Sequence, residues 1–395
     1  MAAASDKARF FLEQSVPELK EYERKGIFSA EEITSIARKR SNFEHKINAR
    51  GSTPADYARY AEFEINVDAL RRKRVKRLGI KATAHNGKRR VFFVFDRGTR
   101  RHPGDISLWM EAIDYAQKQK AYKKLQEMFT QVLRLHPTKA DLWIQAAQYS
   151  FEENGDMMEA RSYMQRGLRF CNGSQTMWLE YARLEMLYIA KIHTRREVLG
   201  ITTDKREQPQ HDEENEDLLP LPRLTSMDIN PEGEGHEVDT STLETLESTP
   251  ALSGAIPIAI FDAAMAQFED PRFGLDFFNM LLDFEDTPAC RRVASHVEAA
   301  LLKDYPQNWS AQACHVQIPV VSISPSSPDF PPAFRQVLTR LKQARQKANS
   351  PELLTWVRLW LEKLMQTQDL DPALKLVGES VAKSLGAPDT SSEGC

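Results

Sequence analysis

Cysteine is scarce in this sequence. The 395 residues include four, and no two of them form a CxxC pair: Cys171, Cys290, Cys314 and Cys395. Such scattered thiols give neither a disulfide framework nor a zinc module, so a reducing compartment fits the composition. The sequence also has no HExxH metal motif, and Gly87-Lys88 lacks the earlier glycine of a phosphate loop. We therefore expect no metal, no cofactor and no small-molecule substrate.

Long hydrophobic runs are missing as well. No stretch approaches the ~18 consecutive apolar residues of a membrane-spanning helix, so we expect no membrane contact. The opening residues, MAAASDKARFFLEQ, lack the charged, apolar and cleavage segments of a secretory signal. Hydrophobic residues nevertheless make up 41% of the chain, which is enough to bury a core.

The chain has no large excess of either charge, since 53 Lys and Arg oppose 56 Asp and Glu. The balance hides two opposite regions. Residues 71–101 contain thirteen Lys or Arg and one acid, a net of +12, whereas residues 203–250 contain fourteen acids and three Lys or Arg, a net of −11. The second region is also rich in Pro, Ser, Thr and Gly. Because that composition cannot support a packed core, we interpret it as a flexible acidic linker.

An aromatic spacing recurs along the first half of the chain. Trp109 and Trp143 are 34 residues apart, Trp143 and Trp178 are 35 apart, and Pro103 and Pro137 are again 34 apart. Within each copy, residues three positions apart share one helical face. A period of 34 with two helices per unit is typical of an α-solenoid of the tetratricopeptide kind. The repeat-defining residues are Tyr57, Tyr60, Phe63, Trp109, Tyr115, Trp143, Tyr149, Arg161, Tyr163, Arg166, Trp178 and Tyr181.

The sequence therefore predicts an all-α fold, an α-solenoid of helical hairpins interrupted by a disordered acidic linker. Ser29 to Glu32 has the form of a capping box, and Thr53-Pro54 reads as the start of the next helix. After Pro306, Trp309 echoes the earlier order of proline and tryptophan. The expected regions are 1–50 (N-terminal helices), 51–199 (repeat array), 200–255 (acidic linker), 256–315 (further repeat-like helices), 316–332 (Pro/Ser-rich loop), 333–387 (C-terminal helical repeat) and 388–395 (tail).

The two-helix unit carries Trp/Tyr-x-x-Tyr-x-x-Phe-Glu in its first helix and Ala-Arg-x-Tyr-x-x-Arg-x-Leu in its second. It resembles the HAT (half-a-TPR) repeat of RNA-handling proteins. The N-terminal runs PELKEYERKGIFSAEEITSIARKRSNFEHKINARG and DYARYAEFEINVDALRRKRVKRL are more specific. Over roughly residues 7–80 they resemble the fungal-like family of HAT-repeat subunits of the UtpB subcomplex, the sixth U-three small nucleolar RNA-associated proteins.

That resemblance implies a non-enzymatic scaffold of the small-subunit processome in the nucleolus, needed for early pre-rRNA processing and small-subunit assembly. Its implied partners are other UtpB subunits, including WD-repeat β-propeller proteins, together with pre-rRNA and the U-three snoRNA particle. In the HAT pattern, Glu64 and Glu185 bond an arginine of a second helix, such as Arg161 or Arg166. The aromatic stripe itself favours core packing between helices over a base-stacking or peptide groove.

The basic run offers three functions that can coexist. It can contact an RNA backbone through counterion release, act as a nuclear-localisation signal, or pair with the acidic linker. On a helix its charge would wrap most of the circumference, which a simple solvated face does not explain. The candidates are Arg71, Arg72, Lys73, Arg74, Lys76, Arg77, Lys88, Arg89 and Arg90. Phe92, Phe93 and Phe95 lie beside them, and helix packing is a more economical role for these rings than base stacking.

Two other functions remain open at this level. The repeat spacing also suits a HAT scaffold of the splicing or mRNA 3′-end machinery, and only residues 7–80 speak against it. A TPR-like peptide-binding adaptor is the third possibility, although Arg and Trp stand here where ordinary TPR motifs have small residues. All three are binding scaffolds, as most α-solenoids are.

Overall fold

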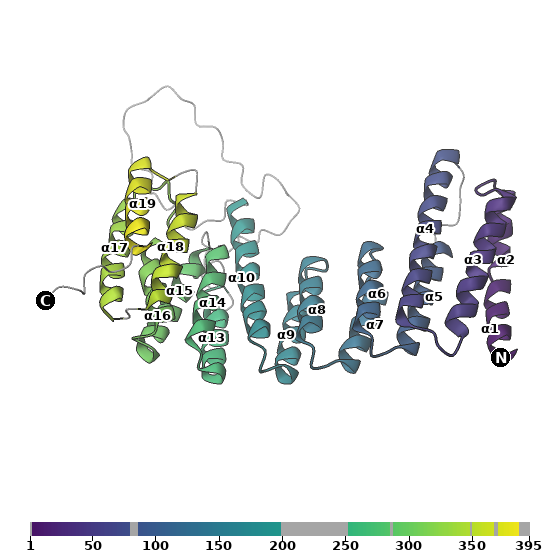
Figure 1. Ribbon diagram of the computed structural model, residues 1–395, viewed down its shortest axis with the longest axis horizontal. Coiled ribbons are helices and arrows are strands. Elements are labelled where there is room, and N and C mark those ends of the chain that lie inside the picture. The colour runs from purple at the N-terminus through teal and green to yellow at the C-terminus, as the bar shows by residue number, and fades with distance from the viewer. Residues whose placement is uncertain are drawn as a thin grey trace, which may run out of the picture. The chain divides into compact units, whose positions relative to one another are not determined.

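The computed structural model describes residues 2–79, 86–198, 252–284, 287–347, 350–366 and 370–386. All the secondary-structure elements in these ranges are α-helices or short 3₁₀ helices, as predicted for an α-solenoid of HAT type (Figure 1). The predicted acidic linker lies almost entirely in 199–251, outside the described residues. Contacts divide the chain into two units, Met1–Trp143 and Ile144–Cys395.

The first unit is a succession of helices in which neighbours pack against each other. Contacts join α1 to α3, α3 to α4, α4 to α5, α5 to α6 and α6 to α7. The helices are α1 (Ala2–Glu13), α2 (Val16–Arg24), α3 (Ala30–Asn48), α4 (Pro54–Leu78), α5 (Asn86–Arg101), α6 (Ile106–Lys118), α7 (Tyr122–Leu135) and the start of α8 (Ala140–Glu152).

Local signals fix where these helices begin and end. Ser29 accepts from the Glu32 backbone and Glu32 accepts from the Ser29 backbone, so the predicted capping box is confirmed. Thr53 caps α4 in the same way with Asp56, which sequence reasoning had not paired with it. Gly79 ends α4 with a φ of 65°, a conformation that favours glycine.

Gly98 lets α5 approach its neighbours closely. A Cβ at this position would lie 2.9 Å from Leu108 on α6 and 3.0 Å from Tyr57 on α4. These distances leave no room for a side chain, because real Cβ contacts are longer. The glycine therefore sets the spacing of α4, α5 and α6, the three helices that carry most of the predicted site.

The second unit is also built of helices that pack against one another. Helix α10 packs against α9, α13 and α14, so helices on either side of residues 199–251 are direct neighbours. Arg183 on α10 bonds Asp283 at 2.9 Å. The elements are α9 (Met157–Phe170), α10 (Gln175–Val198), α13 (Ala255–Phe268), α14 (Pro271–Leu281), η1 (Leu282–Phe284), α15 (Pro288–Asp304), α16 (Trp309–Gln317), η2 (Ile318–Val320), α17 (Phe330–Lys347), α18 (Pro351–Met365) and α19 (Pro372–Gly386).

Residues 316–332, for which the sequence predicts a loop, are more structured than that. They hold the end of α16, the 3₁₀ turn η2 and the first residues of α17. Val316, Ile318 and Val321 are buried, and η2 contacts α17. The high Pro and Ser content masks these few apolar side chains, which pack because neighbouring helices cover them.

One hydrogen bond recurs through the repeats. The indole N–H of Trp109, Trp143 and Trp178 donates to a carbonyl six residues earlier, at 3.1, 2.9 and 2.9 Å. Near Pro306 the side-chain amide of Gln312 makes the equivalent bond, because it donates to the Pro306 carbonyl six residues earlier at 2.6 Å. In each of these places, a side chain near the start of a helix therefore fixes the preceding turn against that helix.

No helix among the described residues combines the length and hydropathy that crossing a bilayer requires.

Candidate nucleic-acid interface

The basic run of residues 71–77 lies on the last turns of α4 and is not uniformly exposed. Arg71 is buried and donates to Asp68 Oδ1 through Nη2 at 2.7 Å and through Nε at 3.0 Å. Arg72 pairs with the same carboxylate and also donates to Gln119 Oε1 at 3.2 Å. These two arginines therefore neutralise a buried aspartate and fix α4 against its neighbours.

Arg74 contacts the first turn of α3 and the residues just before it. Its guanidinium donates twice to Glu32 at 2.6 Å and lies 4.9 Å from the ring centre of Phe28. The hydrogen bonds from Arg74, followed by that from the Ser29 backbone, lower the pKa of Glu32 to about 2. Arg74 is thus held by an ion pair and an aromatic ring.

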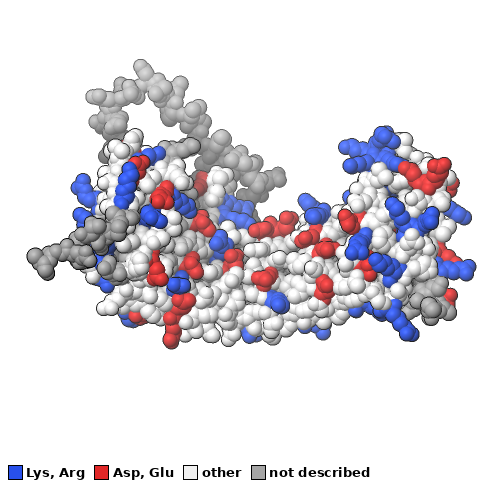
Figure 2. All heavy atoms as spheres, viewed as in Figure 1, with Lys and Arg blue, Asp and Glu red and all other residues white. Residues whose placement is uncertain are grey.

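Lys73, Lys76 and Arg77 are the exposed members of the run. Among the described residues, none of the three makes a hydrogen bond or an ion pair. Figure 2 shows Lys and Arg gathered over this end of α4. The C-terminal end of a helix favours cations, so the backbone stabilises this concentration of charge. The unpaired positive charge of this run is therefore smaller than its six Lys and Arg residues imply, and it comes from Lys73, Lys76 and Arg77.

The second basic segment divides in the same manner on α5. Arg90 donates to Glu18 Oε2 at 2.6 Å and lies 3.9 Å from Glu64. Arg89 is exposed and Lys88 half-buried, and no ion pair ties either one to another described residue. The exposed candidates for phosphate contact are thus Lys73, Lys76, Arg77 and Arg89, with Lys88 beside them.

A buried ionic network connects α2, α3, α4 and α5. Arg40 is 2% exposed and donates to both oxygens of Glu64, at 2.7 and 2.8 Å. Glu18 lies 3.8 Å from Arg40 and accepts from Arg90 and Tyr22. Burial raises the pKa of Glu18, but Arg90 and then Arg40 outweigh it, so the pKa is lowered overall. Glu18 therefore stays ionised because Arg90 and Arg40 lie beside it.

The phenylalanines beside the basic segment pack within the unit. Phe95 is buried, and the Phe92 ring lies 5.1 Å from that of Tyr115. Phe93 is partly exposed, yet it contacts Phe11 and the guanidinium of Arg97. The contacts of Phe92 and Phe95 agree with the helix-packing interpretation, whereas Phe93 keeps an exposed ring.

Comparison with known proteins places this region in a family context. Residues 12–96 match the family model described as U3 small nucleolar RNA-associated protein 6. Residues 95–202 match a second model, the PRP39 N-terminal HAT repeat. The first match spans α2–α5, the helices that hold the ionic network and the basic run.

Curated relatives point the same way. The chain is 37% identical over 199 residues to U3 small nucleolar RNA-associated protein 6 of Schizosaccharomyces pombe, an alignment covering 49% of this chain and 41% of that protein. It is 31% identical over 207 residues to the Homo sapiens homolog, covering 51% and 35%. The Dictyostelium discoideum homolog is 29% identical over 187 residues, covering 47% and 31%. The chain thus spans less than half the length of these relatives.

The HAT match agrees with a repeated ion pair. Arg161 donates to both oxygens of Glu185 at 2.7 Å, as the HAT resemblance implies, whereas Arg166 is exposed and makes no such bond. Arg40 and Glu64 form the same bidentate pair, again 24 residues apart. Sequence reasoning missed Arg40, although this 24-residue separation from Glu64 was the available signal.

The repeat-defining aromatic residues mostly lie inside the helix stack. Phe63 and Trp178 are half-buried, and Phe63 packs against Phe43. The buried members are Tyr57, Tyr60, Trp109, Tyr115, Trp143, Tyr149, Tyr163 and Tyr181. Their burial agrees with core packing between helices. Within the described ranges no group of His, Cys, Asp and Glu is arranged to hold a metal.

Proposed function

We propose that this chain is a non-enzymatic scaffold subunit of a nucleolar pre-ribosomal particle. It contributes to early pre-rRNA processing and small-subunit assembly as part of the UtpB subcomplex of the small-subunit processome. The observation that carries the proposal is the family match over residues 12–96, which coincides with the ionic network and the exposed cations of α4 and α5. The relatives, which are U3 small nucleolar RNA-associated proteins by name, support the nucleolar setting.

The proposed partners are other UtpB subunits, among them WD-repeat β-propeller proteins, and the particle of pre-rRNA with U-three snoRNA. We assign RNA-backbone contact to Lys73, Lys76 and Arg77, with Arg89 and Lys88 extending the field. Contacts of this kind supply affinity without sequence choice. Three further arginines of the basic segments hold the helices in place and are not assigned to RNA. They pair with carboxylates: Arg71 with Asp68, Arg74 with Glu32 and Arg90 with Glu18.

In-cell RNA crosslinking tests the RNA contact. Lys73, Lys76 and Arg77 are changed together to Glu, and a heterologous localisation signal is added so that import is not the variable. We expect crosslinking to pre-rRNA to be lost. Binding of single-stranded RNA in vitro should also lose about 2 from its salt slope, since each phosphate contact contributes about 0.7.

The matched control changes Lys123, Arg134 and Lys139 to Glu, which are exposed cations of the same unit away from the end of α4. This variant should crosslink normally. Equal crosslinking by both variants would contradict the assigned RNA contact. Repeating the α4 variant without the added signal reports on import, and nuclear exclusion there identifies the run as a localisation signal too.

Affinity purification from nuclear extract tests the scaffold role. We expect co-purification of β-propeller proteins and pre-rRNA, and recovery of neither would refute the proposal. Depletion followed by RNA sequencing separates the alternative of a splicing or mRNA 3′-end scaffold. That alternative requires unspliced or uncleaved mRNA together with normal rRNA precursors.

A further inference from the structure

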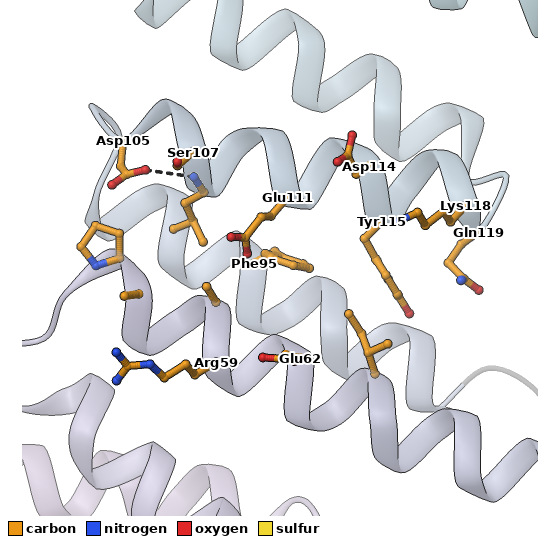
Figure 3. Close-up of a pocket in the computed structure, with 15 residues that line it drawn as sticks. Arg59, Glu62, Phe95, Asp105, Ser107, Glu111, Asp114, Tyr115, Lys118 and Gln119 are labelled. Carbon is orange, nitrogen blue, oxygen red and sulfur yellow. Dashed lines mark hydrogen bonds between the residues drawn. The ribbon is translucent and has the colours of Figure 1, made fainter.

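A groove lies between α4 and α6, with α5 at its base. Its volume is about 660 Å³, within the usual range of ligand-binding clefts. Figure 3 shows the two helices running along its sides and the Phe95 ring between them. The apolar lining consists of Pro54, Ala55, Ala58, Ile65, Phe95, Leu108 and Tyr115.

The groove follows from the spacing of small and acidic residues on the two helices. Helix α4 presents Ala55, Ala58 and Glu62 at intervals of three and four, so they share one helical face. Helix α6 presents Leu108, Glu111 and Tyr115 in the same manner. Small side chains on α4 leave the space that larger ones would fill, while the acids stand along the opening.

Three carboxylates at this opening have no cationic partner. Among the described residues no ion pair involves Glu62, Glu111 or Asp114, and all three are exposed. Two cations also line the groove: Arg59, which lies 3.6 Å from Asp56, and Lys118 at the far end of α6. Asp105 adds a fourth acid, which accepts from the Leu108 backbone at 2.9 Å.

The other acids of α4 and α5 are all paired. Asp56 binds Lys46 at 2.8 Å, Glu64 binds Arg40, Asp68 binds Arg71, and Asp96 binds Lys124 at 3.0 Å. The unit therefore neutralises its carboxylates everywhere on these two helices except at the groove. Uncompensated acids are concentrated where there is also an apolar cavity.

The acids of the groove repel one another. Desolvation by the groove walls raises the pKa of Glu111, and the charges of Asp105, Glu62 and Asp114 raise it further. A cation placed among them would relieve this repulsion, whereas a phosphate would increase it. The groove thus differs in kind from the basic end of α4, and nucleic acid is the wrong occupant for it.

We propose that this groove binds a Lys- and Arg-rich segment of a partner protein, which seats an apolar side chain over Phe95 and sets its cations against Glu62, Glu111 and Asp114. The assignment rests on the scaffold role proposed above and deepens it by naming the chemistry of one partner. Charge complementarity gives the groove its specificity for a basic segment. Burial of an apolar side chain at its base adds affinity that, unlike the charge attraction, salt does not screen.

Fluorescence anisotropy of the full-length chain with synthetic peptides tests this proposal. The probe is a short fluorescein-labelled peptide with alternating Lys and Leu. Two comparison probes replace every Lys by Glu or every Leu by Ser. We expect measurable binding of the Lys/Leu peptide, no binding of the Glu/Leu peptide, and affinity at least about tenfold weaker for the Lys/Ser peptide.

Two variants locate the binding on the chain. Glu62→Lys with Glu111→Lys reverses the charge, and Ala58→Trp fills the cavity without changing charge. Each should weaken binding of the Lys/Leu peptide about tenfold or more. The matched control is Glu23→Lys with Glu31→Lys, two exposed and unpaired acids of the same unit, which should stay within about twofold of the wild type.

Several outcomes overturn the proposal. Unchanged affinity in the groove variants, or equal loss in the control, places the peptide elsewhere. Equal affinity for the Lys/Ser probe would show that the apolar base of the groove does not contribute to binding. Self-association in sedimentation that the groove variants abolish would show that the occupant is a second copy of the chain. Circular dichroism melting of each variant excludes unfolding as the cause of lost binding. The peptide assay needs no nucleolar extract, so its failure and that of the ribosomal role are told apart.

Discussion

Helices α2–α5 bury charged side chains beside an apolar core, whereas α13–α16 pack through aromatic and aliphatic side chains without buried charge among the described residues. In the first group Arg40, Glu44, Glu64, Asp68 and Arg71 are all buried and paired. In the second group the buried side chains include Phe261, Phe273, Phe277 and Phe278, and no charged residue described there is buried. Both groups are stacks of helical hairpins, so the repeat architecture does not dictate the chemistry of the core.

The contrast explains why a basic run is not the same as a basic surface. Where the core contains charge, arginines of the basic segments pair with buried carboxylates, as Arg71 does with Asp68 and Arg90 with Glu18. Buried ion pairs add little net stability, but they penalise wrong registers, because each misplaced charge would be left alone. We infer that the ionic network fixes how α2–α5 fit together, while the phenylalanine core supplies stability.

The largest expected effect comes from breaking the ionic core at its centre. Arg40→Met leaves the buried Glu64 without its bidentate partner and should lower the local free energy of unfolding by about 3–5 kcal/mol. Native-state hydrogen exchange of α3 and α4 peptides measures it. Adding Glu64→Leu should restore most of the loss, because Glu18 keeps Arg90 at 2.6 Å.

A neighbouring arginine serves as the control for that experiment. Arg38→Met removes an exposed cation from the same helix and should change stability by about 0.5 kcal/mol or less. If Arg40→Met costs no more than Arg38→Met, the ionic core is not what holds α3 to α4.

Truncation in the aromatic core should cost a similar or slightly smaller amount for a different reason. Phe277→Ala creates a cavity among Phe261, Phe273 and neighbouring side chains and should cost about 3–4 kcal/mol. Hydrogen exchange of α14 and α15 peptides at low and high salt measures it. The loss should be insensitive to salt, and Met158→Ala, at a side chain that is 75% exposed, should be nearly neutral. A strong salt dependence would undo the contrast between the two groups.

An intermediate effect is expected at the HAT ion pair, where an ionic contact occurs in the second unit. Glu185 is 0% exposed and Arg161 is partly exposed, so Arg161→Ala should cost about 2–3 kcal/mol. Arg166→Ala, at an exposed position of the same helix, should cost about 0.5 kcal/mol or less. Exchange of α9 and α10 peptides reports both values, and equal costs would remove the special role of Arg161.

The smallest effect is expected from acid. Hydrogen bonds from Lys46 and then the Thr53 backbone lower the pKa of Asp56 to about 2, and Arg74 and then Ser29 do the same for Glu32. A carboxylate with a lowered pKa stabilises the fold above its unfolded pKa near 4, and this contribution is lost as the pH falls toward about 2.

Pulse-labelled hydrogen exchange between pH 5 and pH 2 tests that expectation. Protection of α3 and α4 should fall across this window, while protection of α14 and α15 should fall less. Asp56→Asn with Glu32→Gln should remove part of the difference between the regions. Equal acid sensitivity in all four helices would show that the charged core does not govern the response to pH.

Several parts of the molecule could be predicted from short spacings. The caps at Ser29 and Thr53 depend on residues three positions apart, and the tryptophan stripe depends on spacing within one helix. The HAT resemblance named Arg161 or Arg166 as the partner of Glu185, and the structure shows Arg161, 24 residues away. Each of these relations lies within a single helix or between adjacent helices of the repeat.

Other parts could not be predicted. Arg90 binds Glu18 across 72 residues and Arg74 binds Glu32 across 42. Only the packed helices therefore show which cations are paired with carboxylates. Gln312 takes the place of a repeat tryptophan because its position on the helix, not its residue type, sets the bond to Pro306. The groove likewise needs α4 and α6 side by side before Ala58 and Phe95 can line one cavity.

The sequence by itself determined that this chain is a stack of helical hairpins, where its caps fall, and that a strongly basic segment interrupts the repeat. Those properties depend on local periodicity and composition. Only the tertiary structure decided which charges remain free, because burial and pairing join residues far apart in the chain. It left Lys73, Lys76 and Arg77 exposed on α4 and Glu62, Glu111 and Asp114 unpaired at the groove, two surfaces of opposite charge on one set of helices.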